Sequence, residues 1–456
     1  MRSPARWLAG VVAAATVCAI ALPASAKPGD VDPTFGQQGT AWATFRACDC
    51  GGNASMRVQP DGKIVVLGAT HLVRYLLNGR PDTSFGDRGT VALNIGRASP
   101  AGLAIDDAGR IIVVARSTIA ELIQIRRWSD RGVADVPFAK RSALALLHQP
   151  LHVVGVAEQA VGTARRYIIG GSTATGAFVA LAIRADGLLD ATFGVGGRAI
   201  NEGKTYTSAD IPIARSMAIE PGNGRIVVAG QEGSNGSETA GNATVARFTA
   251  RGAPDATFGI GGIAYPTNQY RIIAPTLGLA VAPGGAIYLA GSFRFYRDDD
   301  DQSFLVWRLS ANGSPDTTFA QQGWNLFERE DAPDPAFPPQ AQVVVGDFAQ
   351  AVVVQPDGKP IVSGSRFIVA YTGSDGSHFY RAQALRLLTN GTPDPSFGTN
   401  GWVTGRPGDG RALALHGNRV LLGGDLSTKP PLDYSSVRRP TPPNMPVGLR
   451  TTQFTR

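Results

Sequence analysis

The chain has 456 residues, of which 43% are apolar and 17% are charged. This composition excludes an intrinsically disordered chain, and the length allows two or three domains or one array of repeats. The 56 glycines and 31 prolines are too few for collagen but indicate many turns. The net charge of +7 comes from basic residues scattered along the chain, which argues against a nucleic-acid partner.

Residues 1–26 have the pattern of a secretory signal peptide. Arg2 and Arg6 precede an apolar run over residues 8–22, and Ala24-Ser25-Ala26 is typical of a cleavage site. The apolar run is short for a membrane span, and no later stretch approaches the required length. We therefore expect cleavage before Lys27 and an exported chain that is periplasmic, secreted or on the cell surface, without a membrane span.

Two cysteines remain in the mature chain, Cys48 and Cys50, separated by one aspartate. In an oxidising compartment such a pair forms a small strained disulfide or stays free, and two thiols alone make a weak metal site. The sequence leaves their role open.

One short motif, Asp-x-[Ser/Thr]-Phe-Gly-x-x-Gly, recurs along the mature chain. Its third copy lacks both glycines, and its sixth copy has Ala320 in place of the first glycine. The interval between successive phenylalanines varies from copy to copy, as expected for equal units with loops of variable length in a solenoid or propeller. The aspartates and phenylalanines of the seven copies are Asp32 and Phe35, Asp82 and Phe85, Asp135 and Phe138, Asp190 and Phe193, Asp255 and Phe258, Asp316 and Phe319, and Asp394 and Phe397.

Three apolar segments separate one copy of the motif from the next. The first two predict a hairpin around a tight turn, clearest in the Gln-Pro-Asp-Gly-Lys sequences at residues 59–63 and 355–359. The third segment ends in a glycine-containing turn before the motif, and a fourth short segment follows most copies. No long stretch of the mature chain has helical periodicity. Four antiparallel strands per unit, repeated radially, are typical of β-propeller blades.

The sequence therefore predicts an all-β fold, a seven-bladed β-propeller of four-stranded antiparallel blades, circularly closed by the chain ends. We expect the propeller to span residues 27–428 and to be a monomer. Residues 40–45 can complete the blade begun by the last hairpin at 412–424, which removes an exposed sheet edge. Within the Pro-rich segment 429–456, residues 447–454 are the candidate for the closing strand.

The motif together with the Gln-Pro-Asp-Gly-Lys hairpin resembles the delta-60 repeats of bacteria. The resemblance covers about residues 29–424, and the third and sixth copies depart from the pattern. It implies a secreted or surface β-propeller and implies no activity.

The motif residues are interpreted as structural. One active site does not need seven copies of a residue, whereas seven blades need seven copies of a packing element. The aspartates can accept hydrogen bonds from backbone N–H groups in a turn, and the phenylalanines can fill the space between blades. The glycines permit backbone angles that other residues resist.

The single-copy polar residues give few candidates for a site. At one level of the innermost strands the residues are small except for Arg57, so the sequence predicts a chemically plain channel. His148 and His152 are interpreted as loop or core residues rather than metal ligands. The acidic run Asp298, Asp299, Asp300 and Asp301 lacks the alternating pattern of a calcium loop, although calcium remains a candidate.

The sequence predicts no catalytic, cofactor-binding or metal site, and the function is interpreted as a non-catalytic binding or surface scaffold. An unknown protein or glycan would bind to loops at 293–302, 328–340 and 371–380, with Phe295, Tyr296 and the acidic run as candidate contacts. Two alternatives stay open: an extracytoplasmic enzyme acting on a carbohydrate or small molecule at the channel mouth, and a calcium-dependent adhesin.

Overall fold

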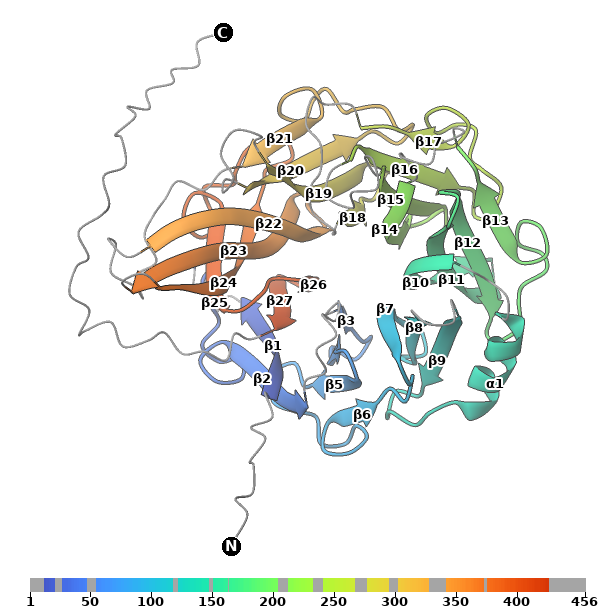
Figure 1. The fold of residues 1–456 in the computed structure, drawn as a ribbon, viewed down its shortest axis with the longest axis horizontal. Helices are drawn as coiled ribbons and strands as arrows, with labels where there is room; N and C mark the ends of the chain where they lie inside the picture. The colour runs from blue at the N-terminus through green and yellow to red at the C-terminus, as the bar shows by residue number, and fades with distance from the viewer. Residues whose placement is uncertain are drawn as a thin grey trace, which may run out of the picture.

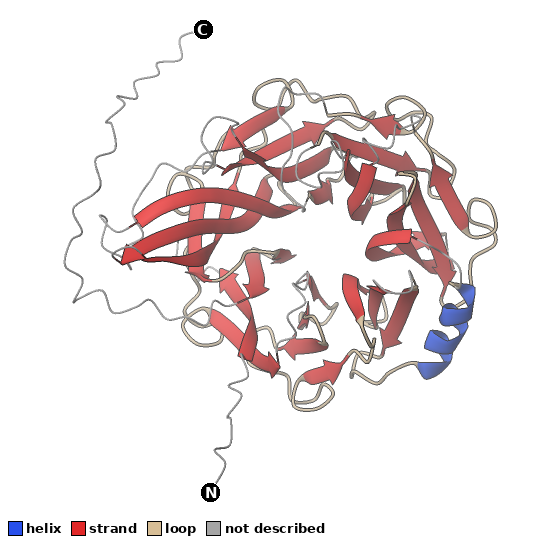
Figure 2. Cartoon of the chain, in the orientation of Figure 1, coloured by secondary structure: helices blue, strands red, loops and turns tan. Residues whose placement is uncertain are grey.

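The computed structural model describes residues 12–20, 27–46, 55–117, 122–146, 151–162, 164–203, 212–232, 241–266, 277–294, 302–327, 342–372 and 375–425. Its antiparallel sheets are arranged around a central axis, and the first strand of most sheets lies nearest the axis (Figure 1). Strands account for nearly all of the regular structure (Figure 2). The chain is therefore an all-β propeller.

Five of the sheets consist of four strands that are consecutive in the chain. They are β3 (Ser55–Val58), β4 (Ile64–Leu67), β5 (His71–Tyr75) and β6 (Thr90–Ala92); β10 (Leu151–Val161), β11 (Ala164–Thr173), β12 (Phe178–Arg184) and β13 (Arg198–Asn201); β14 (Pro212–Ile219), β15 (Ile226–Glu232), β16 (Ala243–Phe248) and β17 (Ile263–Ala264); β18 (Gly278–Val281), β19 (Ile287–Arg294), β20 (Gln302–Leu309) and β21 (Trp324–Phe327); and β22 (Gln342–Val354), β23 (Pro360–Thr372), β24 (Asp375–Arg386) and β25 (Trp402–Pro407).

The prediction of seven four-stranded blades is wrong. The described residues form six four-stranded sheets, so the propeller has six complete blades. The remaining sheet has three strands, β7 (Ala98–Ile105), β8 (Ile111–Ser117) and β9 (Ile123–Trp128). Helix α1 (Val136–Ala145) follows it where the chain would otherwise enter a fourth strand, and it lies at the outer edge of the ring (Figure 1).

Helix α1, which the sequence pattern does not predict, forms at the third copy of the motif. In other copies a glycine after the phenylalanine has a left-handed backbone, with φ of 55° at Gly36 and 54° at Gly86, and turns the chain towards the fourth strand. The third copy has Ala139 there. Pro137 suits the first helical turn, and the Asp135 carboxylate accepts a hydrogen bond from the backbone N of Phe138 and caps the helix.

Strands from both ends of the chain build the sixth four-stranded sheet, which we call the closing sheet. Its order is β2 (Thr40–Arg46), β1 (Val12–Ile20), β27 (Arg419–Asp425) and β26 (Ala412–His416). Strand β1 is antiparallel to both of its neighbours and belongs to the predicted signal peptide. Residues 447–454, the sequence-based candidate for this position, lie outside the described residues.

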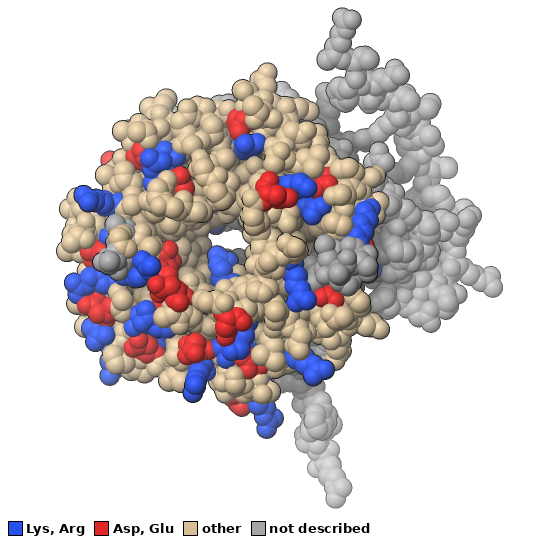
Figure 3. Space-filling model, turned by 180° about the vertical axis from the view of Figure 1, so that it is seen from behind, with Lys and Arg blue, Asp and Glu red and all other residues tan. Residues whose placement is uncertain are grey.

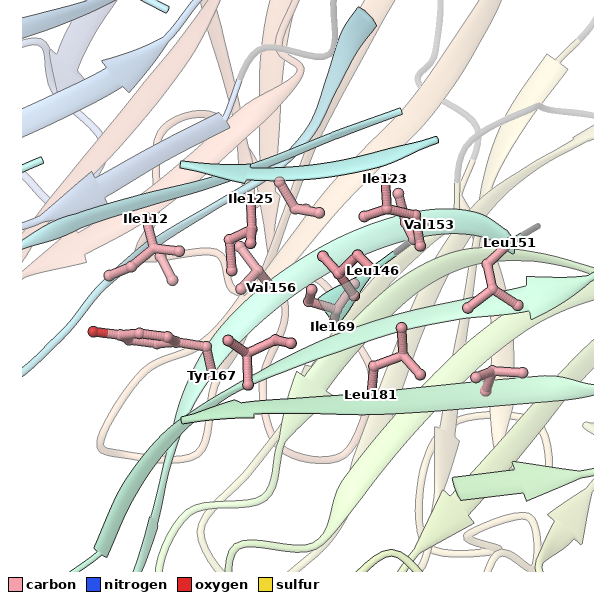
Figure 4. Close-up of a cluster of buried hydrophobic side chains, with 14 of the residues drawn as sticks. Ile112, Ile123, Ile125, Leu146, Leu151, Val153, Val156, Tyr167, Ile169 and Leu181 are labelled. Carbon is pink, nitrogen blue, oxygen red and sulfur yellow. The ribbon is translucent and has the colours of Figure 1, made fainter. Parts of the chain in front are cut away.

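Apolar side chains fill the spaces between neighbouring sheets. Between the three-stranded sheet and the next one, Ile112 and Ile125 pack with Val156, Ile169 and other buried side chains (Figure 4). Each fully buried aliphatic side chain contributes about 1.5–3 kcal/mol. Comparable clusters lie at other joints between sheets, so the core is a set of small cores around the ring rather than one central core.

The turns between first and second strands, and between third and fourth strands, lie on one face of the ring, because successive strands are antiparallel. Hydrogen bonds join these turns from sheet to sheet: Gly86 donates its N–H to the carbonyl of Arg131 at 3.2 Å, and Gly259 to that of Asn312 at 2.7 Å. We call this side the constant face, because segments 76–89, 249–262 and 310–323 have the same length.

The opposite side, which we call the variable face, carries the connections between second and third strands and from each sheet to the next. These connections differ widely in length, from the two residues 373–374 to the fourteen residues 328–341. The spacing differences between motif copies therefore arise mainly on the variable face.

Ala320 provides a test of the turn geometry. It keeps a left-handed backbone with φ of 45°, where equivalent copies have glycine. A Cβ at the equivalent Gly259 would clash with the carbonyl oxygen of Ile263. We expect Ala320→Gly to raise the free energy of unfolding by about 0.5–1 kcal/mol, after allowing for the greater entropy of glycine in the unfolded chain.

Denaturant unfolding measures this change, with Gly259→Ala as the reverse control that should destabilise. A decrease in stability for Ala320→Gly would contradict the argument.

Candidate functional site

The motif aspartates and phenylalanines lie at the joints between neighbouring sheets. All seven phenylalanine rings are at most 1% exposed. Six of the rings pack against the glycine in a turn of the following sheet. A Cβ on Gly132 would lie 2.9 Å from the ring of Phe85, and one on Gly313 would lie 2.8 Å from the ring of Phe258. Glycine is needed in these turns because the ring approaches so closely.

One carboxylate oxygen of the motif aspartate organises the motif itself. In six copies, Oδ1 accepts hydrogen bonds from the backbone N and the hydroxyl of the serine or threonine two residues later. For Asp255 the distances to Thr257 are 3.0 Å and 2.6 Å. Such turns fix the direction in which the chain leaves the third strand.

The second carboxylate oxygen binds an arginine that the sequence analysis missed. In five copies the arginine lies eight residues before the aspartate, near the end of the preceding strand. Arg247 contacts Asp255 at 2.9 Å, and its guanidinium also donates to the carbonyl of Ala311 in the next sheet. The five pairs are Arg74 and Asp82, Arg127 and Asp135, Arg247 and Asp255, Arg308 and Asp316, and Arg386 and Asp394. The repeated spacing was the available sequence signal.

The same guanidinium groups lie on the motif phenylalanines. Their central carbons are 4.1–5.9 Å from the ring centroids, within the range of a cation–π interaction. We call the combination of arginine, motif aspartate, motif phenylalanine and the turn of the next sheet the inter-blade latch. It uses the charge of these five aspartates, so their carboxylates are not available to a ligand.

At Asp190 the latch is built from a different strand. Residue 182, eight positions earlier, is alanine, and Arg166 of the second strand β11 takes the place of the missing arginine. Arg166 contacts Asp190 at 2.7 Å, donates to the carbonyl of Ala250 at 2.5 Å and lies 4.7 Å from the centroid of Phe193. The position of the guanidinium is thus kept although its source changes.

The latches lower the pKa of the carboxyl groups that they contain. Desolvation by burial raises the pKa of Asp394, but hydrogen bonds from Ser396 and Lys359 and the charge of Arg386 outweigh it and lower the pKa to about 2. The pKa values of Asp82, Asp190 and Asp255 are lowered by the same balance. These four aspartates are therefore ionised structural groups at neutral pH.

A second group of polar residues lies where the β22–β25 sheet meets the closing sheet. Asp347 of β22, Ser365 of β23, Gln383 of β24 and the residues Asp409 and Arg411 before β26 form this group, which we call the junction cluster. Gln383 donates to Asp347 at 2.6 Å, Ser365 donates to Asp409 at 3.3 Å, and Arg411 pairs with Asp409 at 2.6 Å. The cluster joins strands of two sheets at the variable face.

Part of the junction cluster is deeply buried. Asp347 is 4% exposed, and Ser365 and Gln383 are at most 1% exposed. The oxygen Oε1 of Gln383 is buried and has no hydrogen-bond partner among the described residues. Such an acceptor costs about 1–3 kcal/mol unless a water molecule or a ligand satisfies it.

Next to the junction cluster, two aromatic rings pair on adjacent strands. Phe367 and Tyr380 have ring centroids 4.9 Å apart, and Tyr380 is 40% exposed. Desolvation by burial and the charge of Asp409 raise the pKa of Tyr380, which therefore stays protonated at neutral pH. The phenol can act as a hydrogen-bond donor at the surface.

His152, one of the two histidines that the sequence analysis singled out, lies near two arginines from neighbouring sheets. The imidazole Nδ1 contacts the guanidinium of Arg116. Burial, with the positive charges of Arg116 and Arg215, lowers the pKa of His152 to about 4. The imidazole is therefore neutral at pH 7. His148 lies outside the described residues.

An open channel runs through the centre of the ring, and basic and acidic side chains lie side by side around the face seen in Figure 3. Arg57 of β3 is exposed to solvent, yet nearby protein desolvates its guanidinium and lowers its pKa. The arginine donates to the carbonyl of Met56 at 2.8 Å. These properties suit a side chain that faces the channel.

Several sequence-based candidates lie outside the described residues. These are Phe295, Tyr296, Asp298, Asp299, Asp300 and Asp301, most of the loops at 293–302 and 328–340, and both Cys48 and Cys50. Within the described residues, no group of three or more His, Cys, Asp or Glu side chains is arranged to hold a metal ion. No helix in the described part of the chain is long and apolar enough to cross a membrane.

Three segments match the family model of a β-propeller domain of unknown function (DUF5122): residues 59–85, 222–258 and 283–319. Each segment begins in a hairpin turn of the constant face and ends at a motif phenylalanine. The matches support a propeller repeat family. A comparison with curated proteins found no match.

Two solved structures illustrate the similarity of this chain to known proteins at low identity. AofleA from Arthrobotrys oligospora is 12% identical, with 87% of this chain and 96% of that chain covered and a TM-score of 0.37. XC5397 from Xanthomonas campestris, described as a gluconolactonase, is 12% identical, with 90% and 100% covered and a TM-score of 0.33. Such scores carry no information about activity.

From the latch contacts we predict that removing the arginine strongly lowers the free energy of unfolding. Arg247→Ala should lower the free energy of unfolding by about 3–5 kcal/mol, because Asp255 is left buried with a weaker set of partners. Denaturant unfolding measures the change. Arg251→Ala, in an exposed turn of the same sheet, is the matched control and should change stability by less than about 0.5 kcal/mol. Equal effects of the two substitutions would refute the latch.

The lowered pKa of His152 predicts that the stability of the folded chain depends on pH. Because its pKa is about 4 in the folded chain and ordinarily 6.5, the unfolded chain binds the proton more readily. Its contribution to stability is present above pH 6.5 and is lost as the pH falls towards 4. We expect His152→Asn to flatten this part of the stability profile, and an NMR titration of the imidazole to give a pKa well below 6.5. An unshifted titration would contradict the burial argument.

Proposed function

We propose that the protein is an exported, non-catalytic β-propeller that binds a protein or glycan partner through its variable face. The contact region is the β22–β24 extension, defined as residues 365–382, together with the adjacent junction cluster. The signal-peptide pattern of residues 1–26 supports export, with cleavage before Lys27.

The observation that carries this proposal is the separation of two kinds of polar residue. Six of the seven repeated aspartates are paired with arginines in latches, and the segments of the constant face keep nearly constant lengths. The single-copy polar residues Asp347, Gln383 and Asp409 of the junction cluster lie at the variable face. Binding residues concentrate in variable segments that a rigid scaffold positions.

The β22–β24 extension is also a single-copy feature. Its strands are 13, 13 and 12 residues long, whereas β3, β4 and β5 have 4, 4 and 5 residues. The sheet projects beyond the rest of the ring (Figure 1). Tyr380 offers an exposed aromatic ring with a polar tip next to charged residues, a combination favoured at protein and glycan contacts.

The proposal is tested by binding of the purified exported protein to a glycan array and to cell-envelope polysaccharides and proteins of the source cells. Tyr380→Ala should weaken the binding about thirtyfold, as expected for an aromatic contact at the centre of an interface. Val195→Ala, which alters an exposed side chain on the constant face, is the control and should leave binding unchanged. Binding that tolerates Tyr380→Ala but is lost in Val195→Ala would place the contact on the constant face and overturn the proposal.

One observation favours the alternative of an extracytoplasmic enzyme that acts on a carbohydrate or small molecule at the channel mouth. A neutral imidazole beside an arginine, as at His152 and Arg116, can accept a proton next to a group that binds anions. A turnover screen with hydrolase and lyase substrates tests this alternative. Activity that His152→Asn abolishes without unfolding the protein would replace the binding proposal.

A further inference from the structure

The closing sheet lacks a latch arginine on its third strand. The residue eight positions before Asp32 is Ala24, in the predicted signal peptide. Strand β1 ends at Ile20, twelve residues before Asp32, whereas β5, β16 and β20 each end seven residues before their motif aspartates. Strand β1 thus occupies the position of a third strand without the spacing that the other sheets share.

A pocket of about 230 Å³ lies at this joint. Its lining consists of Asp32, Thr34, Phe35, Leu77, Asn78 and Arg419. Asp32, Thr34, Phe35 and Leu77 correspond to Asp82, Ser84, Phe85 and Asp130, which contact the guanidinium of Arg74 in the next latch. The pocket therefore presents a carboxylate, a hydroxyl, a phenyl face and a carbonyl where the other joints hold a guanidinium.

Arg419 occupies this site only at its edge. The guanidinium lies 3.6 Å from Asp32 and 3.4 Å from the carbonyl of Leu77, longer than the 2.7 Å between Arg166 and Asp190. At Asp394 the second-strand cation Lys359, at 3.1 Å, accompanies the latch arginine Arg386 rather than replacing it. Arg419 corresponds to such a second cation.

We propose that in the exported chain residues 434–439 form the third strand of the closing sheet and that Arg438 enters the Asp32 pocket. This inference rests on the proposed removal of residues 1–26, which takes β1 away and opens the edges of β2 and β27. The ligand of the pocket is a guanidinium group, supplied by a segment of this chain outside the described residues.

The sequence of this segment fits the described third strands. Tyr434 precedes Arg438 by four residues, as Phe304 precedes Arg308, and Val437 precedes the arginine as Val73 precedes Arg74. Pro440 follows and would end the strand, because proline cannot donate to a neighbouring strand. The arginine would lie next to the last strand residue, as in β5, β16 and β20.

The connection has the length and direction that the sheet needs. The segment 426–433, between the end of β27 and Tyr434, is intermediate in length between the β19–β20 connection at 295–301 and the β15–β16 connection at 233–242. A strand that follows β27 through this connection is antiparallel to it, as β1 is, and runs towards the constant face where Asp32 lies. The earlier candidate, residues 447–454, would need the much longer connection 426–446.

The test uses the full gene product, purified after export, with its starting residue determined by intact mass. Denaturant unfolding of Arg438→Ala, Asp32→Ala and the double variant gives the coupling between the two side chains. We expect Arg438→Ala to raise the unfolding equilibrium constant about ten- to a hundredfold, and to have less than about a twofold effect once Asp32 is alanine. Hydrogen exchange should show protected amides at 434–439.

Arg450→Ala is the matched control, because Arg450 follows Leu449 in the competing segment. A coupling of Arg450 rather than Arg438 to Asp32 would assign the strand to residues 447–454 and overturn the inference. No coupling of either arginine, in a chain that begins at Lys27, would overturn the inference and leave the proposed export intact. A mass that retains residues 1–26 would overturn both, because β1 would then be a permanent strand.

Discussion

The ring depends on one buried ion pair that recurs at its joints. A guanidinium lies on a phenylalanine, binds the motif aspartate and reaches a turn carbonyl of the next sheet, as Arg247 does with Phe258, Asp255 and Ala311. A buried ion pair adds little to stability compared with well-packed apolar groups, but it is directional, and loss of one partner is costly. The latch therefore fixes how neighbouring sheets are oriented, while apolar packing supplies most of the stabilisation.

The latch also explains why the two faces differ. Its members must meet across a joint, so the turns of the constant face tolerate little change in length. Insertions therefore accumulate on the opposite face, which the latches do not reach. The β22–β24 extension and the junction cluster lie there. Polar residues that differ from sheet to sheet are therefore found on the variable face.

The six complete blades illustrate a limit of counting motifs. The third copy keeps Asp135 and Phe138, and both take part in a latch with Arg127. Without the glycines, the backbone after Phe138 continues into helix α1 instead of turning towards a fourth strand. The aspartate and phenylalanine of a motif copy therefore indicate a joint between sheets. The glycines indicate whether a fourth strand follows that copy.

The sequence by itself determined the all-β class, the repeated turns and the hairpins, because these depend on residues that are close to one another in the chain. The spacing of Arg247 and Asp255 was equally local and was overlooked. Only the tertiary structure decided which carbonyl completes each latch, that Arg166 replaces the missing arginine at Asp190, and that Asp347, Gln383 and Asp409 lie in one cluster. These contacts join strands of different sheets or distant segments of the chain. A local sequence pattern does not indicate which of these residues come into contact when the ring closes.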